Sequence, residues 1–173
     1  MIIGILYSFI SAGQQTVINA GVSIELPTNA KRVTKEGALA HVRKIFKDTL
    51  ALGSIRFGAE NKKYFYTTDN ILIELIGTDT TYILKKDKLL AVKNALDEYA
   101  RSVKTHSSFI KKGNHNATVV TEDVYGKINY YNFFCINDAN TRILSGVLKF
   151  NDEDKAEATI IFNNLLASIK FKD

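Results

Sequence analysis

Apolar and polar residues alternate along most of the C-terminal third of the chain, and this alternation predicts four consecutive strands. The breaks between them are rich in Gly, Asn and Asp, which are typical of tight turns. Because such short connections join strands that run in opposite directions, we expect an antiparallel arrangement. The expected strands are Ser107–Lys112, Ala117–Glu122, Lys127–Ile136 and Arg142–Phe150.

Three other segments repeat apolar residues every three or four positions, a spacing that predicts amphipathic helices. The first begins after Thr34, a good N-cap residue, and runs to about Leu50, and the second covers about Asp87–Arg101. The third is capped by Asn151, and its first turn is Asp152-Glu153-Asp154, where the helix dipole favours acidic side chains. Its expected buried stripe comprises Ala158, Ile161, Phe162, Leu165 and Ile169.

The first half of the chain contains further short strand patterns. Gly21–Pro27 alternates apolar and polar residues and stops at the only proline of the chain. The other expected strands are Ser54–Gly58, Lys63–Thr67, Asn70–Gly77 and Thr80–Leu84. Strands that arrive in runs, rather than alternating with helices, indicate an α+β fold. We expect an antiparallel β-sheet covered by about three amphipathic helices.

Length and composition are those of one globular domain. The 173 residues include 46% hydrophobic and 24% charged residues, which is ordinary for a folded domain of this size. The single cysteine, Cys135, excludes an internal disulfide. Because it lies in the apolar run Tyr130–Ile136, we expect a buried and inert thiol.

The first residues have the character of an export signal. Met1–Ala12 is uncharged and apolar, and it is shorter than the ~20 residues that a membrane-spanning helix needs. Small residues at Ser11-Ala12-Gly13 resemble a cleavage site, although no Lys or Arg precedes Lys31. We therefore expect residues 1–13 to be a signal peptide and residues 14–173 to be one exported domain, periplasmic or extracellular, without a membrane span. The alternative is a cytoplasmic protein in which residues 1–13 form a structural strand.

The net charge of +5 comes from lysines that are scattered in pairs along the chain. Nucleic-acid-binding domains instead gather positive charge on one face and often add arginines or stacking aromatics. We therefore expect no nucleic-acid partner and interpret the lysines as a solvated surface.

Motifs of catalysis and cofactor binding are absent from the sequence. It contains no Gly-x-Ser-x-Gly elbow, no Gly-x-Gly-x-x-Gly and no phosphate-binding loop. The three histidines have no spacing typical of metal ligands, so we expect no metal, no cofactor and no catalytic residue. The alternative is a hydrolase with a dispersed active site, which would require His106, Glu122 and Asp123 to converge in one cleft.

Aromatic residues gather on two of the expected strands and occupy both strand faces. One face must meet the helices, and the other is available for a partner or an apolar ligand. The candidate binding residues are Tyr64, Tyr66, Tyr130, Tyr131 and Phe133. Complete burial of Tyr131 and Phe133 under helices would exclude this binding face.

Two stretches of the chain resemble a known fold group. The strand Ser23–Pro27 follows the apparent signal, and Gly146–Phe150 ends a long hairpin before a capped amphipathic helix. This order resembles the Mog1/PsbP-like fold, including the DcrB-like exported domains, over about residues 21–171. The resemblance implies a protein that binds other macromolecules without catalysis, as photosystem accessory proteins, a nuclear-transport factor and secretion chaperones of this group do.

The sequence therefore favours an exported, non-catalytic binding or accessory protein that recognises a protein or an apolar segment. The alternatives are a carrier of a small apolar ligand, which would need an internal cavity, and the dispersed hydrolase.

Overall fold

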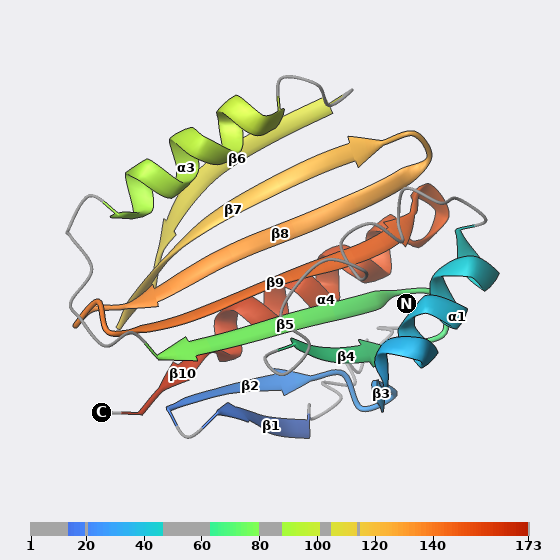
Figure 1. The fold of residues 1–173 in the computed structure, drawn as a ribbon, viewed down its shortest axis with the longest axis horizontal. Coiled ribbons are helices and arrows are strands. Elements are labelled where there is room, and N and C mark those ends of the chain that lie inside the picture. The colour runs from blue at the N-terminus through green and yellow to red at the C-terminus, as the bar shows by residue number, and fades with distance from the viewer. Residues whose placement is uncertain are drawn as a thin grey trace, which may run out of the picture.

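The computed structural model describes residues 14–19, 21–46, 63–79, 88–100, 105–113 and 115–172. Its largest element is an antiparallel sheet of seven strands, in the spatial order β3-β4-β5-β9-β8-β7-β6 (Figure 1). These strands are β3 (Lys31–Val33), β4 (Lys63–Thr67), β5 (Leu72–Asp79), β6 (Thr105–Lys112), β7 (Asn116–Tyr125), β8 (Ile128–Asn137) and β9 (Arg142–Asn151).

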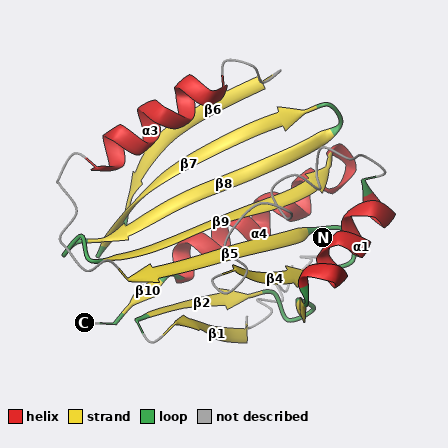
Figure 2. Cartoon of the chain, in the orientation of Figure 1, coloured by secondary structure: helices red, strands yellow, loops and turns green. Residues whose placement is uncertain are grey.

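A smaller sheet packs beside the large one. It contains β1 (Gln14–Asn19), β2 (Val22–Leu26) and β10 (Lys170–Phe171), with β2 in the middle. The described helices are α1 (Lys35–Ile45), α3 (Lys88–Tyr99) and α4 (Lys155–Ser168). Figure 2 shows that α4 lies on one face of the large sheet, whereas α1 and α3 lie on the other. The α+β fold with an antiparallel sheet covered by helices is therefore confirmed.

Strands β6 to β9 form the meander that the alternation of residues predicts. The register between β6 and β7, and between β7 and β8, is continuous over the full length of each pair. Two of the turns use the residues that tolerate left-handed backbone, because Gly126 has φ 63° and Asn140 has φ 56°. The side chain of Asn137 secures the second turn by accepting hydrogen bonds from the backbone N–H groups of Thr141 and Arg142.

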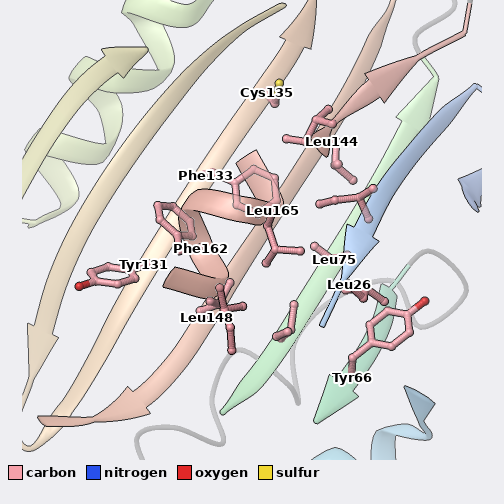
Figure 3. Close-up of a cluster of buried hydrophobic side chains, with 14 of the residues drawn as sticks. Leu26, Tyr66, Leu75, Tyr131, Phe133, Cys135, Leu144, Leu148, Phe162 and Leu165 are labelled. Atoms are coloured by element: carbon pink, nitrogen blue, oxygen red, sulfur yellow. The ribbon is translucent and has the colours of Figure 1, made fainter. Parts of the chain in front are cut away.

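The main core lies between the large sheet, α4 and β2, a region shown in Figure 3. The ring of Phe162 on α4 lies 5.1 Å from the ring of Tyr131 and 6.1 Å from that of Phe133, measured between centroids. Such tilted aromatic pairs add to the free energy gained from burying the rings. We call this side of the large sheet the α4 face. The buried stripe predicted for the last helix is confirmed, since Ala158, Ile161, Phe162, Leu165 and Ile169 are all buried.

The other side of the large sheet, which we call the α1/α3 face, is covered less completely by the described helices. Helix α1 covers one end, where Ala38 and Val42 pack against Phe65 and Leu72. Helix α3 lies against β6 and β7 at the other end. Between the two helices, side chains such as that of Asn132 are only half-buried.

The expected start of the last helix is corrected by the structure. The side chain of Asn151 makes no capping hydrogen bond, residues Asp152–Asp154 form a 3₁₀ turn, and α4 begins at Lys155. The reason is that two of the acids have tertiary partners, which hold them away from a regular first turn. Asp152 accepts a hydrogen bond from Asn129, and Asp154 accepts one from Asn70.

The other predicted elements can be compared where the structure describes them. Thr34 caps α1 by accepting a hydrogen bond from the N–H of Gly37, and Phe46 is the C-cap of this helix. The predicted continuation to Leu50, the strands Ser54–Gly58 and Thr80–Leu84, and the signal peptide of residues 1–13 lie outside the described residues. Strands β1, β3 and β10 were not predicted. Two of them, β3 and β10, are too short to show a period.

Close packing at Gly146 leads to a testable prediction. A methyl group there would lie 2.6 Å from a ring carbon of Phe133 and 2.7 Å from the backbone oxygen of Glu74. Because the backbone cannot move aside without cost, Gly146→Ala should lower the free energy of unfolding by about 1–3 kcal/mol in urea denaturation. Ser145→Ala, on the opposite face of the same strand, is the control and should change stability by less than about 0.5 kcal/mol. Equal stability of the two variants would contradict the prediction.

Candidate functional site

A cluster of polar side chains joins α3 to β6, β7 and β8, the three strands at one end of the large sheet. His106 of β6 lies directly opposite Asp123 of β7, and its Nδ1 atom is 2.5 Å from Asp123 Oδ1. Its other ring nitrogen, Nε2, lies 3.0 Å from Oδ1 of Asp97 on α3. The imidazole is therefore held between two carboxylates that come from different elements.

Four neighbouring side chains complete what we call the His106 cluster. Two of them bind Asp97, because Ser108 Oγ donates to Oδ1 at 2.5 Å and Lys93 Nζ donates to Oδ2 at 2.7 Å. The other two bind Asp123 Oδ2, with Thr121 Oγ1 at 2.9 Å and Asn132 Nδ2 at 2.8 Å. Each carboxylate thus receives charge-assisted hydrogen bonds on both oxygens. The cluster consists of Lys93, Asp97, His106, Ser108, Thr121, Asp123 and Asn132.

The electrostatics of the cluster favour the imidazolium form of the histidine. Burial by itself lowers the pKa of His106, but the hydrogen bonds and charges of Asp123 and Asp97 outweigh burial, and the pKa lies above its ordinary value. Hydrogen bonds from Lys93, Ser108 and His106 hold the pKa of Asp97 well below its usual range. A protonated His106 can donate to both carboxylates at once, which a neutral ring cannot do.

This geometry does not suit acid–base or nucleophilic catalysis. A general base needs a free ring nitrogen, yet both nitrogens of His106 are bound to carboxylates. The hydroxyl of Ser108 donates to Asp97, whose lowered pKa makes that carboxylate a weak base, and His106 does not contact the hydroxyl with a free nitrogen. The dispersed-hydrolase hypothesis also required Glu122, but this residue is exposed, and its side chain points to the face opposite Asp123.

The cluster is equally unsuited to a metal ion. Its two carboxylates bind opposite nitrogens of one ring, so the three groups do not converge on a common point. Among the described residues, no group of three or more His, Cys, Asp or Glu side chains is arranged to hold a metal.

The aromatic residues predicted to bind a partner are divided between the core and the surface. Tyr66, Tyr131 and Phe133 are buried in the core on the α4 face, and the hydroxyl of Tyr131 is hydrogen-bonded to Thr159 at 2.9 Å. Because α4 covers Tyr131 and Phe133, these two residues do not form an exposed binding face on the sheet. The strand period indicates that these two side chains share a face, but it does not show which helix covers that face.

Tyr64 of β4 and Tyr130 of β8 are half-buried. The guanidinium carbon of Arg32 lies 5.1 Å from the centre of the Tyr64 ring, and the Tyr130 ring packs edge-on against Tyr125. The two tyrosines lie on opposite faces, since Tyr64 packs against the main core and Tyr130 packs against the second apolar cluster, which α1 covers. They therefore do not form one binding surface together, and each stays a candidate by itself.

A buried ion pair lies on the α1/α3 face. The ammonium of Lys149 is 2.5 Å from Glu74 Oε1, and the Lys149 side chain is fully buried. Lys63 approaches the other oxygen of Glu74 at 3.9 Å. Burial lowers the pKa of Lys149 despite the nearby charge of Glu74. We interpret this pair as structural, because it joins the neighbouring strands β5 and β9 beneath the surface.

Cys135 is buried in the core, and burial raises the pKa of its thiol to about 11. The predicted burial of this cysteine is confirmed. A thiol with so high a pKa forms little thiolate at neutral pH, so it is a poor nucleophile.

Most of the large apolar side chains that are exposed among the described residues lie at the outer edge of the large sheet, on β6 and α3. Phe109 and Ile110 of β6 are 46% and 39% exposed, and Leu90 of α3 is 53% exposed. The remaining large apolar side chain that is exposed among the described residues is Ile160, on the outer side of α4. The candidate functional site therefore consists of β6 and α3, which the His106 cluster holds together.

Comparisons with known proteins identify the fold. No family model matches the sequence, and no curated protein matches it. Cyanobacterial PsbP (CyanoP) from Synechocystis sp. PCC 6803 is similar in structure, with a TM-score of 0.53, 8% identity and 96% of each chain covered. LpqN of Mycobacterium tuberculosis, described as involved in cell envelope biogenesis, gives a TM-score of 0.52 and 8% identity over 93% of this chain and 86% of LpqN.

The Ran-binding protein Mog1p of Saccharomyces cerevisiae is also similar, with a TM-score of 0.48 and 8% identity over 91% of this chain and 94% of Mog1p. The chain has the Mog1/PsbP-like fold, which confirms the resemblance found in the sequence. Identities this low establish the fold alone. Among the described helices, none combines the length and apolar character that crossing a membrane requires.

The raised pKa of His106 predicts how stability depends on pH. A group whose pKa rises on folding stabilises the folded state fully below its unfolded pKa, which is about 6.5 for histidine. This contribution declines as the pH increases above about 6.5 and is lost once the pH passes the raised pKa of folded His106. At pH ~5.5, His106→Gln should therefore be less stable than the wild type by about 1.5–3 kcal/mol, and the difference should shrink at higher pH.

Urea denaturation of both proteins at a series of pH values from about 5.5 to 8.5 measures this difference. Ser107→Ala is the matched control, because its exposed side chain points away from the cluster on the same strand. A difference between wild type and His106→Gln that stays constant over this range would show that the imidazolium does not contribute.

Proposed function

We propose that this protein is an exported, non-catalytic accessory protein that binds a partner protein through the surface formed by β6 and α3. The observation that carries the proposal is the distribution of exposed apolar side chains. Three of the four large ones among the described residues, Leu90, Phe109 and Ile110, lie on these two neighbouring elements. They gather at one edge of the sheet, although Phe109 and Ile110 point to opposite faces of β6, and exposed apolar side chains that gather in one region are typical of interaction sites.

The interior of the His106 cluster supports binding over catalysis. Its hydrogen bonds satisfy both carboxylates and both ring nitrogens, which leaves no group there with the freedom to transfer a proton. The same bonds fix the position of α3 on the sheet, so the cluster supplies a rigid support for a binding surface.

The names of the structural neighbours agree with this class of function. Mog1p is described as a Ran-binding protein, LpqN as involved in cell envelope biogenesis, and CyanoP as a cyanobacterial PsbP. These descriptions belong to those proteins. A carrier of a small apolar ligand is less favoured, because Tyr66, Tyr131 and Phe133 fill the core instead of facing a ligand.

Site-specific photo-cross-linking tests the binding proposal. A benzophenone amino acid replaces Phe109 in one variant and Ile160 in another, and both are produced in the cells that naturally make the protein. Ile160 is the matched control, since it is an equally apolar side chain, 63% exposed, on α4, which is not part of the proposed surface. We expect a discrete cross-linked protein at position 109 and none at position 160. The absence of an adduct at position 109, or identical adducts at both positions, would refute the proposal.

Export is tested by the N-terminus of the mature protein. Cleavage after Gly13 would leave all described strands intact, because β1 begins at Gln14. We therefore expect N-terminal sequencing of the protein from the envelope or medium to begin at Gln14. Recovery of the intact chain, starting at Met1, from the cytoplasm would instead support the cytoplasmic alternative.

A further inference from the structure

Strand β6 is the outermost strand of the large sheet, at the end where α3 lies (Figure 1). It pairs with β7 over all eight of its residues, Thr105–Lys112, without any shift in register. None of the described strands pairs with its outer edge. A regular strand in this position presents a row of backbone N–H and C=O groups that can accept an additional strand.

This edge lacks most of the features that normally protect a sheet from pairing with another chain. Such features include charged side chains along the strand, proline, a bulge or a very short length. The stretch from Ser107 to Ile110 contains no charged residue and no proline, and its pairing with β7 shows no bulge. Instead, Phe109 and Ile110 project from opposite faces of the strand and are both exposed.

The His106 cluster makes this edge rigid. His106 and Ser108 bind Asp97 of α3, and His106 also binds Asp123 of β7. These hydrogen bonds come from the first half of β6 and tie it to its neighbours on one face. A preorganised strand loses little conformational entropy when a partner adds to it, which favours binding.

The charge of the edge restricts the chemistry of its partner. Lys111 and Lys112 are exposed at the end of β6, and the strand contains no acidic residue. A second copy of this chain, with its net charge of +5, would bring more positive charge to the same edge. A segment with acidic residues beside the two lysines would neutralise them, and complementary charge also steers association.

We propose that β6 binds an extended segment of a partner protein as an added antiparallel strand. In antiparallel pairing, the residues opposite Lys112, Lys111, Ile110 and Phe109 follow one another in that order along the partner. The segment therefore carries two acidic residues followed directly by two apolar residues. This assignment rests on the proposed protein-binding function and specifies the chemistry of the partner. Backbone hydrogen bonds supply affinity, and the charged and apolar pairs supply register.

Synthetic peptides as long as β6 test this assignment. The probe has two glutamates followed by two valines and then threonines, and the control peptide has the same composition with the valines before the glutamates. Binding is measured by fluorescence anisotropy of labelled peptides, and the site by hydrogen exchange of the β6 amides. We expect the probe to bind at least about fivefold more tightly than the control and to protect those β6 amides that face outward.

Protein variants separate the two parts of the recognition. Phe109→Lys should weaken binding of the probe, whereas Ile160→Lys on α4 should not. Charge reversal with Lys111→Glu and Lys112→Glu should also weaken the probe, and a peptide with lysines in place of the glutamates should restore binding to this variant. Thermal unfolding of each variant checks that these exposed substitutions leave the fold intact.

Three results would overturn the assignment: equal binding of the probe and control peptides, binding without protection of β6 amides, or a wild-type dimer in sedimentation that Phe109→Lys converts to a monomer. The last result would assign the edge to a second copy of this chain. Suppose that a partner is cross-linked at position 109, but the two peptides bind equally or bind without protecting β6 amides. The proposal of an added strand is then refuted, and the proposed binding function is not. Without a cross-linked partner at position 109, the proposed function itself fails.

Discussion

The packing of helix α4 against the large sheet determines which surfaces of the protein are open to a partner. Phe162 contacts Tyr131 and Phe133 there, and burial of each such ring stabilises the fold by about 1.5–3 kcal/mol. A partner that displaced α4 would have to replace several of these contacts at once. The α4 face is therefore closed, and recognition is left to the edges of the sheet and the partly covered α1/α3 face.

The parts of the fold that follow from local signals could be predicted from the sequence. Thr34 caps α1 and Gly126 turns between β7 and β8, because both act through neighbours within a few residues. Long-range pairing left no such signal. Glu74 and Lys149 form a buried ion pair only because β5 and β9 are neighbours, although the two residues lie 75 positions apart in the chain. The acids Asp152 and Asp154 likewise have partners that no local pattern indicates.

The candidate site could be predicted only in part. Alternation shows that Tyr130 and Tyr131 point to opposite faces, but it does not show which face α4 covers, so core residues were included among the binding residues. The His106 cluster had a usable signal, because counting outward from the turn at Gly113 places His106 opposite Asp123. The position of Asp97 depends on how α3 lies against the sheet, and no pattern in the sequence specifies that placement.

A function carried by a strand edge also accounts for the lack of a recognisable motif. Catalysis and metal binding require particular side chains at fixed spacings, whereas an added strand is held mainly by backbone groups that every residue possesses. Such an edge requires only a regular strand with few charges and a support that keeps it straight. The His106 cluster provides that support through hydrogen bonds which, by occupying both nitrogens of His106, also prevent it from acting as a catalyst. Under the proposed function, the same interactions that occupy the nitrogens of His106 also hold β6 in place for its partner.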